Sequence, residues 1–350
     1  MGGTDEIGCA VIGLGRIGRV HAANLARAVH GARLLTVCDV DAAACERVAA
    51  ELRVAACTAP EAVFARDDVE VVVIATTTAS HPELIAAAAR AGKAVFAEKP
   101  VALTQAASDG ALREVVEAGV AFQIGFQRRW DAAYLLARQQ IEAGAIGRPR
   151  LFRAIGRDPA PAPIAYHDPA SGGGIFLDAA IHDFDAARFL LGGAAGNEAV
   201  RVLAHGANLA YPELAAIDDL DTCVTLLDFA DGALGVCEWN RFAGYGEDVF
   251  AEVQGTEGTL RLGGTRRQPL LTLSGGRAGR ELVSGFGMRF AEAFRDELQA
   301  FVDALRSGRA PRPGVEDARR ALQIALCARR SFVEQRRIEF DPLPPLTAAG

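Results

Sequence analysis

The sequence contains only two lysines, Lys93 and Lys99, so nearly all of its cationic side chains are arginines. It also lacks any Cys-x-x-Cys pair, and its seven cysteines are odd in number and irregular in spacing, which makes them a poor disulfide framework. We therefore expect a reducing compartment, the cytoplasm. A lysine that persists in so arginine-rich a chain needs a chemical explanation.

Long apolar runs and an excess of positive charge are also missing. No stretch is apolar for long enough to span a bilayer, and Glu6 stands where a secretory signal would carry basic residues. The formal net charge of the 350 residues is -7, so no global basic field attracts nucleic acid or anionic lipid. We expect no export, no membrane and no nucleic-acid partner, and a small neutral or cationic substrate fits better.

The first part of the chain alternates short apolar runs with helical patterns. We predict strands at 7–12, 34–38, 69–76, 94–97 and 121–125, and helices at 16–29, 41–50 and 82–91. Strands that alternate with helices pair in parallel and form a doubly wound α/β sheet. Because the chain is too long for one ordinary core, we expect two domains, at 1–124 and 125–350.

A glycine motif stands where the first predicted strand meets the first predicted helix: Gly13-Leu14-Gly15-Arg16-Ile17-Gly18. Its glycines permit a tight turn and let the backbone approach a pyrophosphate, whose charge then lies at the positive end of the helix. Asp39 ends the second predicted strand, where its carboxylate would accept hydrogen bonds from ribose hydroxyls and repel a 2′-phosphate. The pattern predicts a Rossmann domain that binds NAD in preference to NADP.

Glu98-Lys99-Pro100 follows the fourth predicted strand, at the edge of the sheet where open α/β folds bind ligands. Proline would hold the preceding lysine in a defined, extended direction, so that its ammonium group could hydrogen-bond a reacting hydroxyl. A solvated loop lysine is the alternative. Near the end of the third strand, Thr76 and His81 are further residues that we place beside the nucleotide, His81 in a supporting role.

Strand-like runs with turn-rich links dominate the rest of the chain. We predict strands at 150–155, 200–205, 222–229, 234–239, 249–253 and 259–262. Such runs can pair as antiparallel meanders, so we expect a C-terminal α+β domain with a large, mainly antiparallel open sheet.

Within this second domain, Gly172-Gly173-Gly174 leads into a helical segment that carries Asp178 and His182, four residues apart and therefore on one helical face. A histidine supported by a carboxylate can remove a hydroxyl proton while the carbon gives hydride to nicotinamide. A surface Asp–His pair without function is the alternative. No zinc-type spacing links the histidines and aspartates, so we expect no catalytic metal.

Together these motifs resemble the Gfo/Idh/MocA family of glucose-fructose oxidoreductase, inositol dehydrogenase and rhizopine catabolism proteins. The resemblance covers nearly the whole chain and includes 13–21, 97–100 and 181–189, while 123–131 and 156–159 resemble the inositol 2-dehydrogenase branch. It implies that Lys99, Asp178 and His182 form the catalytic set and that the peptide before Pro100 is cis. It also implies homodimers or homotetramers assembled through the open face of the second sheet.

The resemblance further implies a cyclic polyol substrate, most closely myo-inositol, oxidised at one secondary hydroxyl. The residues expected to hold its hydroxyls, besides the catalytic set, are Arg128, Arg157, Asp158, His167 and Tyr245. Leu177 and the segment around Tyr245 and Phe250 depart from the inositol branch, which leaves scyllo-inositol, an aldose or an anhydrosugar open. A non-catalytic dinucleotide sensor is the remaining alternative, and the presence of lysine, aspartate and histidine together favours an enzyme.

Overall fold

The computed structural model describes residues 6–160, 168–192, 196–263, 272–274, 277–279 and 281–346. The chain divides into two compact units, each with one large sheet. The first unit comprises Met1–Gln127, Glu292–Leu322 and Pro342–Gly350, and the second comprises Arg128–Ala291 and Gln323–Asp341. In the described part of the chain, no helix is long and apolar enough to cross a membrane.

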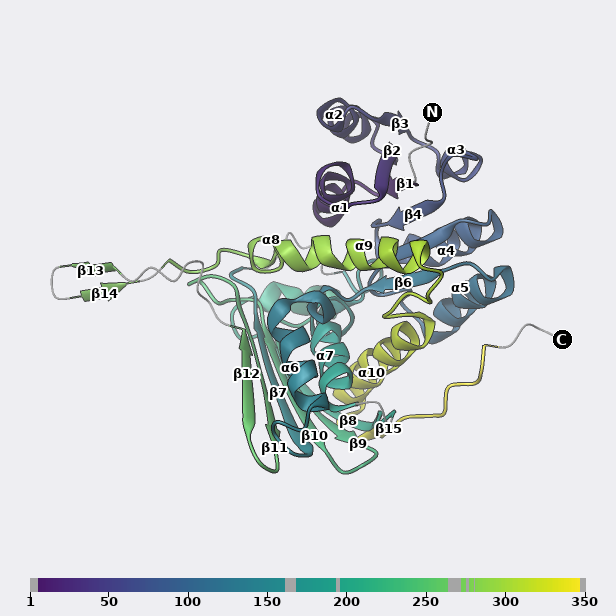
Figure 1. Cartoon of the computed structure of the whole chain (residues 1–350). Helices are drawn as coiled ribbons and strands as arrows, with labels where there is room; N and C mark the ends of the chain where they lie inside the picture. Colours follow the sequence, from purple (N-terminus) through teal and green to yellow (C-terminus); the bar gives the residue numbers. More distant parts are fainter. Residues whose placement is uncertain are drawn as a thin grey trace. The chain divides into compact units, whose positions relative to one another are not determined.

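The sheet of the first unit is parallel throughout, with the strand order β3-β2-β1-β4-β5-β6 (Figure 1). Its strands are β1 (Ile7–Ile12), β2 (Ala32–Cys38), β3 (Ala55–Cys57), β4 (Val71–Ile74), β5 (Ala94–Glu98) and β6 (Phe122–Gly125). Its helices include α1 (Arg16–Arg27), α2 (Ala42–Leu52), α3 (Pro60–Phe64), α4 (His81–Arg90) and α5 (Gln105–Ala118). The predicted doubly wound parallel sheet is confirmed.

The strand order reverses between β1 and β4, the central pair of this sheet. All four residues of β4, Val71 to Ile74, are buried, because a parallel sheet is covered on both faces and its strands are apolar throughout. In such sheets, ligands bind outside the carboxyl ends of the strands at this reversal. The first strand-to-helix turn and the loop after β4 lie at this position.

Helix α9 (Ala291–Arg306) supplies part of the first unit's core from far along the sequence. Its Leu298, Phe301 and Val302 join the apolar cluster that contains Val11 and Phe96. Each such side chain contributes about 1.5–3 kcal/mol on burial. The first unit is therefore discontinuous, whereas the sequence suggested one boundary near residue 124. An apolar helical stripe shows that a helix is buried, but not which sheet it covers.

The second unit contains a seven-stranded sheet in the order β12-β11-β7-β10-β9-β8-β15. All neighbours are antiparallel except β7 and β10, which pair in parallel, so the predicted mainly antiparallel sheet is confirmed. The strands are β7 (Pro149–Arg157), β8 (Ala199–Ala207), β9 (Thr222–Phe229), β10 (Leu234–Asn240), β11 (Asp248–Gly255), β12 (Thr259–Gly263) and β15 (Ile338–Glu339).

The two faces of this sheet differ in burial. Along β9, Cys223, Thr225 and Leu227 are buried, whereas Val224 and Leu226 are 39% and 46% exposed, the alternation expected of a strand covered on one side. Helices α6 (Ala132–Glu142) and α7 (Ile181–Leu191) cover the buried face (Figure 1). The other face of the sheet exposes apolar side chains to solvent.

The remaining elements are short or peripheral, apart from one long helix. Strands β13 (Thr272–Ser274) and β14 (Arg277–Gly279) form a separate hairpin, and α8 (Phe286–Arg289) follows them. Helix α10 (Val315–Glu334) gives its first part to the first unit and the residues from Gln323 onward to the second.

Candidate active site

The three motif glycines meet different demands in the structure. Gly13 has a φ of +92°, and a Cβ there would lie 2.6 Å from the backbone of Ala75 and Thr76. A Cβ on Gly18 would collide with the carbonyl oxygen of Gly13. At Gly15, by contrast, a Cβ would meet no atom within 4 Å. The fold therefore requires glycine at two of these positions, and at the third the open space suits the close approach of a ligand.

This open space lies at the amino end of α1, whose first two residues are Arg16 and Ile17. Gly15 is the N-cap residue, makes no side-chain capping bond, and is followed by no acidic residue in the first turn. The N–H groups of the first turn carry partial positive charge and have no intrahelical partners. They fit the pyrophosphate of a dinucleotide.

Asp39 directly follows β2 and contacts the glycine motif. Its Oδ2 accepts a hydrogen bond of 2.6 Å from the backbone N–H of Leu14, and its Oδ1 accepts one of 2.9 Å from Asp41. Each oxygen has a further lone pair, so the carboxylate can still accept bonds from ribose hydroxyls. No cation follows it in sequence, because the next residues are Val40 and Asp41. The residues present therefore fit NAD.

His81 joins the loops that follow β4 and β5. The side chain is buried, its Nδ1 lies 2.8 Å from the carbonyl oxygen of Pro100, and its Nε2 lies 3.2 Å from that of Thr76. Burial lowers the pKa of His81, although the two carbonyl groups oppose the shift. Both ring nitrogens face backbone carbonyl oxygens, so His81 contacts the loop after β4 at Thr76 and the loop after β5 at Pro100.

The two lysines have different surroundings. Lys93 is buried, and its Nζ donates a bond of 2.7 Å to the carbonyl oxygen of Arg66. Lys99 is half-buried and follows β5 directly. The peptide between Lys99 and Pro100 is cis, as the resemblance implied. Glu98, expected beside the cofactor, places its Oε1 2.7 Å from Nε2 of His21.

In the second unit, Asp178 and His182 lie on consecutive helical segments. Phe176–Ala180 is π-helical and α7 continues from Ile181. From residue 173 to residue 188 every side chain is buried except those of Asp178 and His182, which are partly exposed. π-Helical turns inside α-helices are frequent at functional sites. The predicted pair therefore shares one accessible face of an otherwise buried helix.

Two buried side chains from distant loops hold the start of this helix. Asp219 Oδ1 accepts a bond of 2.8 Å from the N–H of Ile175, and its Oδ2 lies 3.3 Å from Nη1 of Arg241. Burial raises the pKa of Asp219 to about 6, with a smaller contribution from the charge of Asp178, while the N–H bonds oppose the shift. Burial lowers the pKa of Arg241 to about 10.

Arg128 is enclosed rather than open to a ligand. It forms a buried ion pair with Asp183, and its guanidinium lies 5.6 Å from the ring centre of Trp239 and 5.8 Å from that of Phe290. Burial opposes the charge, but Asp183 raises the pKa of Arg128 above its usual range. The neighbouring Arg129 makes two bonds of 2.8 and 2.7 Å to Asp185. These pairs anchor the first turns of α7, directly after His182.

The other predicted substrate contacts lie near the ends of β7 and β10. Arg157 donates to Glu238 over 2.9 Å and to the hydroxyl of Tyr245 over 3.2 Å, and that hydroxyl donates to Asp248. Asp158 accepts a bond of 3.3 Å from Nε1 of Trp239. Tyr245 is 48% exposed and is the most accessible of these groups. The predicted contact His167 lies outside the described residues.

Comparison with known proteins assigns both units. Residues 7–126 match the profile of an oxidoreductase family with an NAD-binding Rossmann fold, and residues 134–261 match the Gfo/Idh/MocA C-terminal domain. The chain belongs to the Gfo/Idh/MocA family. It is an oxidoreductase of this family, and its cofactor is NAD.

Several relatives within this family are similar over nearly their full length. The chain is 38% identical to scyllo-inositol 2-dehydrogenase (NAD(+)) of Bacillus subtilis, covering 96% of this chain and 97% of that protein. It is 36% identical to myo-inositol 2-dehydrogenase of Thermotoga maritima, covering 95% and 98%. A scyllo-inositol dehydrogenase structure from Lactobacillus casei with NAD(H) and scyllo-inositol aligns with a TM-score of 0.89 at 31% identity, covering 95% and 99%.

Sequence reasoning missed several buried polar residues of this Gfo/Idh/MocA protein. Asp219, Arg241 and Glu247 in the second unit come from loops without a motif. Burial raises the pKa of Glu247 to about 8, and the charge of Asp158 adds to the shift. Glu297 in the first unit had a visible signal, because it lies beside Phe294, Leu298 and Phe301 on the apolar stripe of α9.

Proposed function

We propose that the protein oxidises one secondary hydroxyl of a cyclic polyol with NAD, and that its substrate is myo-inositol. The observation that carries the proposal is the accessible pair Asp178 and His182 on an otherwise buried helix. The names of the inositol dehydrogenase relatives support the substrate class. Scyllo-inositol is the second candidate, because the relative from Bacillus subtilis is named for it.

The proposed roles follow from the chemistry of each side chain. His182 is the base that takes the hydroxyl proton, and Asp178 orients and electrostatically supports its ring. Lys99 donates a hydrogen bond to the same oxygen and stabilises the negative charge that develops there. Bound NAD supplies the hydride acceptor. Tyr245, Arg157 and Asp158 would hold the other hydroxyls, while Arg128 holds α7 through Asp183.

Turnover of purified protein with a panel of ring substrates tests the proposal. With NAD we expect reduced cofactor from myo-inositol or scyllo-inositol, and little from deoxy-inositols, because unpaired buried polar groups penalise a missing hydroxyl. NADP should support much less turnover because of Asp39. Turnover of a pyranose alone would overturn the inositol assignment, and equal efficiency with both cofactors would overturn the role of Asp39.

We also propose that the protein works in the cytoplasm as a homodimer or homotetramer. All seven cysteines are free, which suits a reducing compartment. The open face of the second sheet exposes Val224, Leu226 and Leu234, and an apolar patch of this kind marks an interaction surface. Light scattering of the purified protein measures the assembly, and a monomer at micromolar concentration would contradict it.

A further inference from the structure

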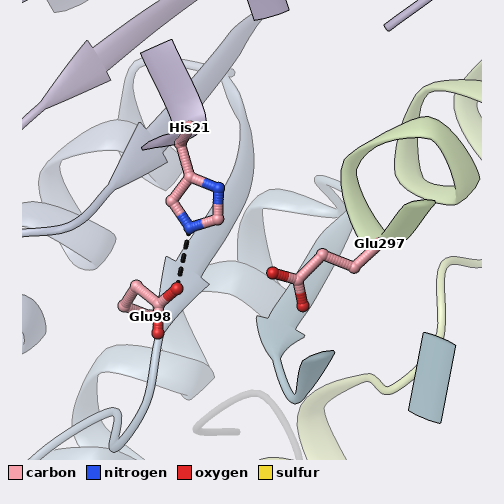
Figure 2. A group of neighbouring side chains, drawn as sticks. All are labelled: His21, Glu98 and Glu297. Carbon is pink, nitrogen blue, oxygen red and sulfur yellow. Dashed lines mark hydrogen bonds and ion pairs between the residues drawn. The ribbon is translucent and has the colours of Figure 1, made fainter. Parts of the chain in front are cut away.

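Three ionisable side chains meet inside the first unit. His21 comes from α1, Glu98 from the end of β5 and Glu297 from α9 (Figure 2). One nitrogen and one oxygen from each carboxyl group all lie within 4.8 Å of one another. His21 and Glu297 are fully buried, and the side chain of Glu98 is 12% exposed. Two carboxyl groups thus share one buried space.

Glu98 is held by both of its oxygens. Oε1 lies 2.7 Å from Nε2 of His21, and Oε2 accepts the backbone N–H of Lys99 over 3.3 Å. Gly125 leaves the room for this carboxyl group, since a Cβ there would lie 3.2–3.3 Å from its three terminal atoms. The side chain of Glu98 therefore connects His21 directly to the backbone of the candidate catalytic lysine.

Glu297 points toward the His21–Glu98 pair, as Figure 2 shows. Neither of its carboxyl oxygens has a hydrogen-bond partner among the residues that the structure describes. Burial, reinforced by the charge of Glu98, raises the pKa of Glu297 well above its usual value. The uncharged side chain of Gln123 packs here too and donates to the backbone carbonyl of Glu297 over 2.9 Å. A neutral, protonated carboxyl group is the form that this space favours.

The geometry favours a proton over a metal ion as the bridging charge. Two ligands on a tetrahedral zinc, at about 2.0–2.2 Å from the ion, are about 3.4 Å apart. His21 Nε2 and Glu98 Oε1 are only 2.7 Å apart, which is a hydrogen-bond distance.

The imidazole of His21 has one polar partner among the described residues, the carboxyl group of Glu98. Its Nδ1 is buried without a partner in the described chain, and Phe96 and Phe294 meet the ring edge-on at 5.3 and 6.0 Å. With Nε2 donating to Glu98, the proton that limits repulsion between the two carboxyl groups belongs to Glu297.

We propose that Glu297 is a positioning residue for Lys99: its neutral carboxyl group lies within 4.8 Å of Glu98 and can turn its proton toward it, so that Glu98 keeps its bonds to His21 and to the Lys99 backbone. This inference rests on the proposed dehydrogenase function only for the role of Lys99. The protonation of Glu297 itself stands on the buried geometry of the first unit.

Glu297→Gln and Glu297→Leu separate this role from simple packing. The amide of glutamine can donate to Glu98, whereas leucine has similar bulk and no donor. We expect Glu297→Gln to keep kcat near the wild-type value, and Glu297→Leu to lose about tenfold in kcat, with the KM for NAD unchanged in both. Glu292→Gln, on the exposed side of the same helix, is the matched control and should behave as wild type.

Infrared difference spectroscopy tests the proton without relying on turnover. Wild-type protein minus Glu297→Gln should show the carbonyl stretch of a protonated carboxylic acid, shifted in deuterated water, whether or not the protein oxidises a polyol. Absence of that band, or one tightly bound metal ion per chain by elemental analysis, would overturn the proposal. Equal kcat in the two Glu297 variants would overturn the positioning role, while failure of all inositols would bear only on the proposed function.

Discussion

The two units hold their candidate site residues by different physical means. In the first unit, the groups that we propose to face the cofactor are backbone N–H groups at the start of α1, and Gly15 leaves open space beside them. In the second unit, the helix of His182 is fixed by buried ion pairs, Arg128 with Asp183 and Arg241 with Asp219. Backbone N–H groups can bind a phosphate whatever side chains the residues carry. A pair of proton-transfer side chains, by contrast, needs neighbouring side chains that hold it in position.

The largest expected effect breaks the second unit's function and leaves the first intact. His182→Ala should lower kcat by about a hundredfold to ten-thousandfold, because it removes a positioned proton acceptor. NAD affinity, measured by fluorescence titration of the cofactor, should stay within about twofold, because the dinucleotide motif lies in the other unit.

His30→Ala is the control for this variant, since His30 is an exposed residue in the turn after α1 whose bonds to Gln299 are made by its backbone, and it should be replaceable without loss. Wild-type turnover in His182→Ala, under conditions where hydride transfer limits the rate, would mean that another group removes the proton.

The pH dependence of stability sharpens the comparison of the two units, because it measures the free-energy cost of ionising a buried carboxyl group in the second unit. The pKa of Glu247 is raised by burial to about 8, above its unfolded value, so folding retains a proton there. The associated stability is fully present below about pH 4.3 and is lost as the pH rises through 8. Glu247→Gln should remove this loss, roughly 2–4 kcal/mol.

Thermal unfolding of the wild type and Glu247→Gln at pH 5.5 and pH 9 measures the difference. Between pH 5.5 and pH 9, the unfolding midpoint temperature of the wild type should fall further than that of the variant. Parallel losses in the two proteins would show that Glu247 ionises at its ordinary value.

The smallest expected effect concerns the first unit alone. Gly15→Ala should weaken NAD binding by about ten- to thirtyfold, because the new methyl group occupies the space beside the helix end where the pyrophosphate approaches. The unfolding midpoint should not fall, since no protein atom lies within 4 Å of that methyl group.

Gly110→Ala is the matched control, because it also adds a methyl group into open space, in the interior of α5. It should raise stability by about 0.4–1 kcal/mol and leave NAD affinity unchanged. Unchanged NAD affinity in Gly15→Ala as well would remove the reason for placing the pyrophosphate there.

The sequence predicted features that depend on local patterns and missed those that depend on contacts between distant segments. The parallel sheet, the glycine turn and Asp39 are local patterns, and the sheet and the NAD-binding fold are confirmed. The six predicted strands of the second sheet are also present, because alternating burial is a local property. The parallel pairing of β7 with β10 was not foreseen, since pairing between strands far apart in sequence is decided by the whole fold.

Candidate site residues followed the same rule. Asp178 and His182 were found through their spacing on one helix, and their catalytic roles stay predictions. Asp219 could not be found in this way, because the N–H of Ile175 that it binds is 44 residues away in sequence. Arg128 looked like a substrate contact from its position, and only its tertiary partner Asp183 shows that its guanidinium is already engaged.

Because the chain has only two lysines, nuclear magnetic resonance of its labelled amino groups would give a simple spectrum. Reductive methylation with carbon-13 labels amino groups, and this sequence offers only Lys93, Lys99 and the terminal amine. The ammonium group of Lys93 donates a hydrogen bond to the carbonyl of Arg66. The chemical shift of its labelled methyl groups should therefore stay constant when a polyol or a nucleotide is added. The methyl resonance of Lys99 then becomes a direct reporter of ligand arrival, readable without assigning any other residue.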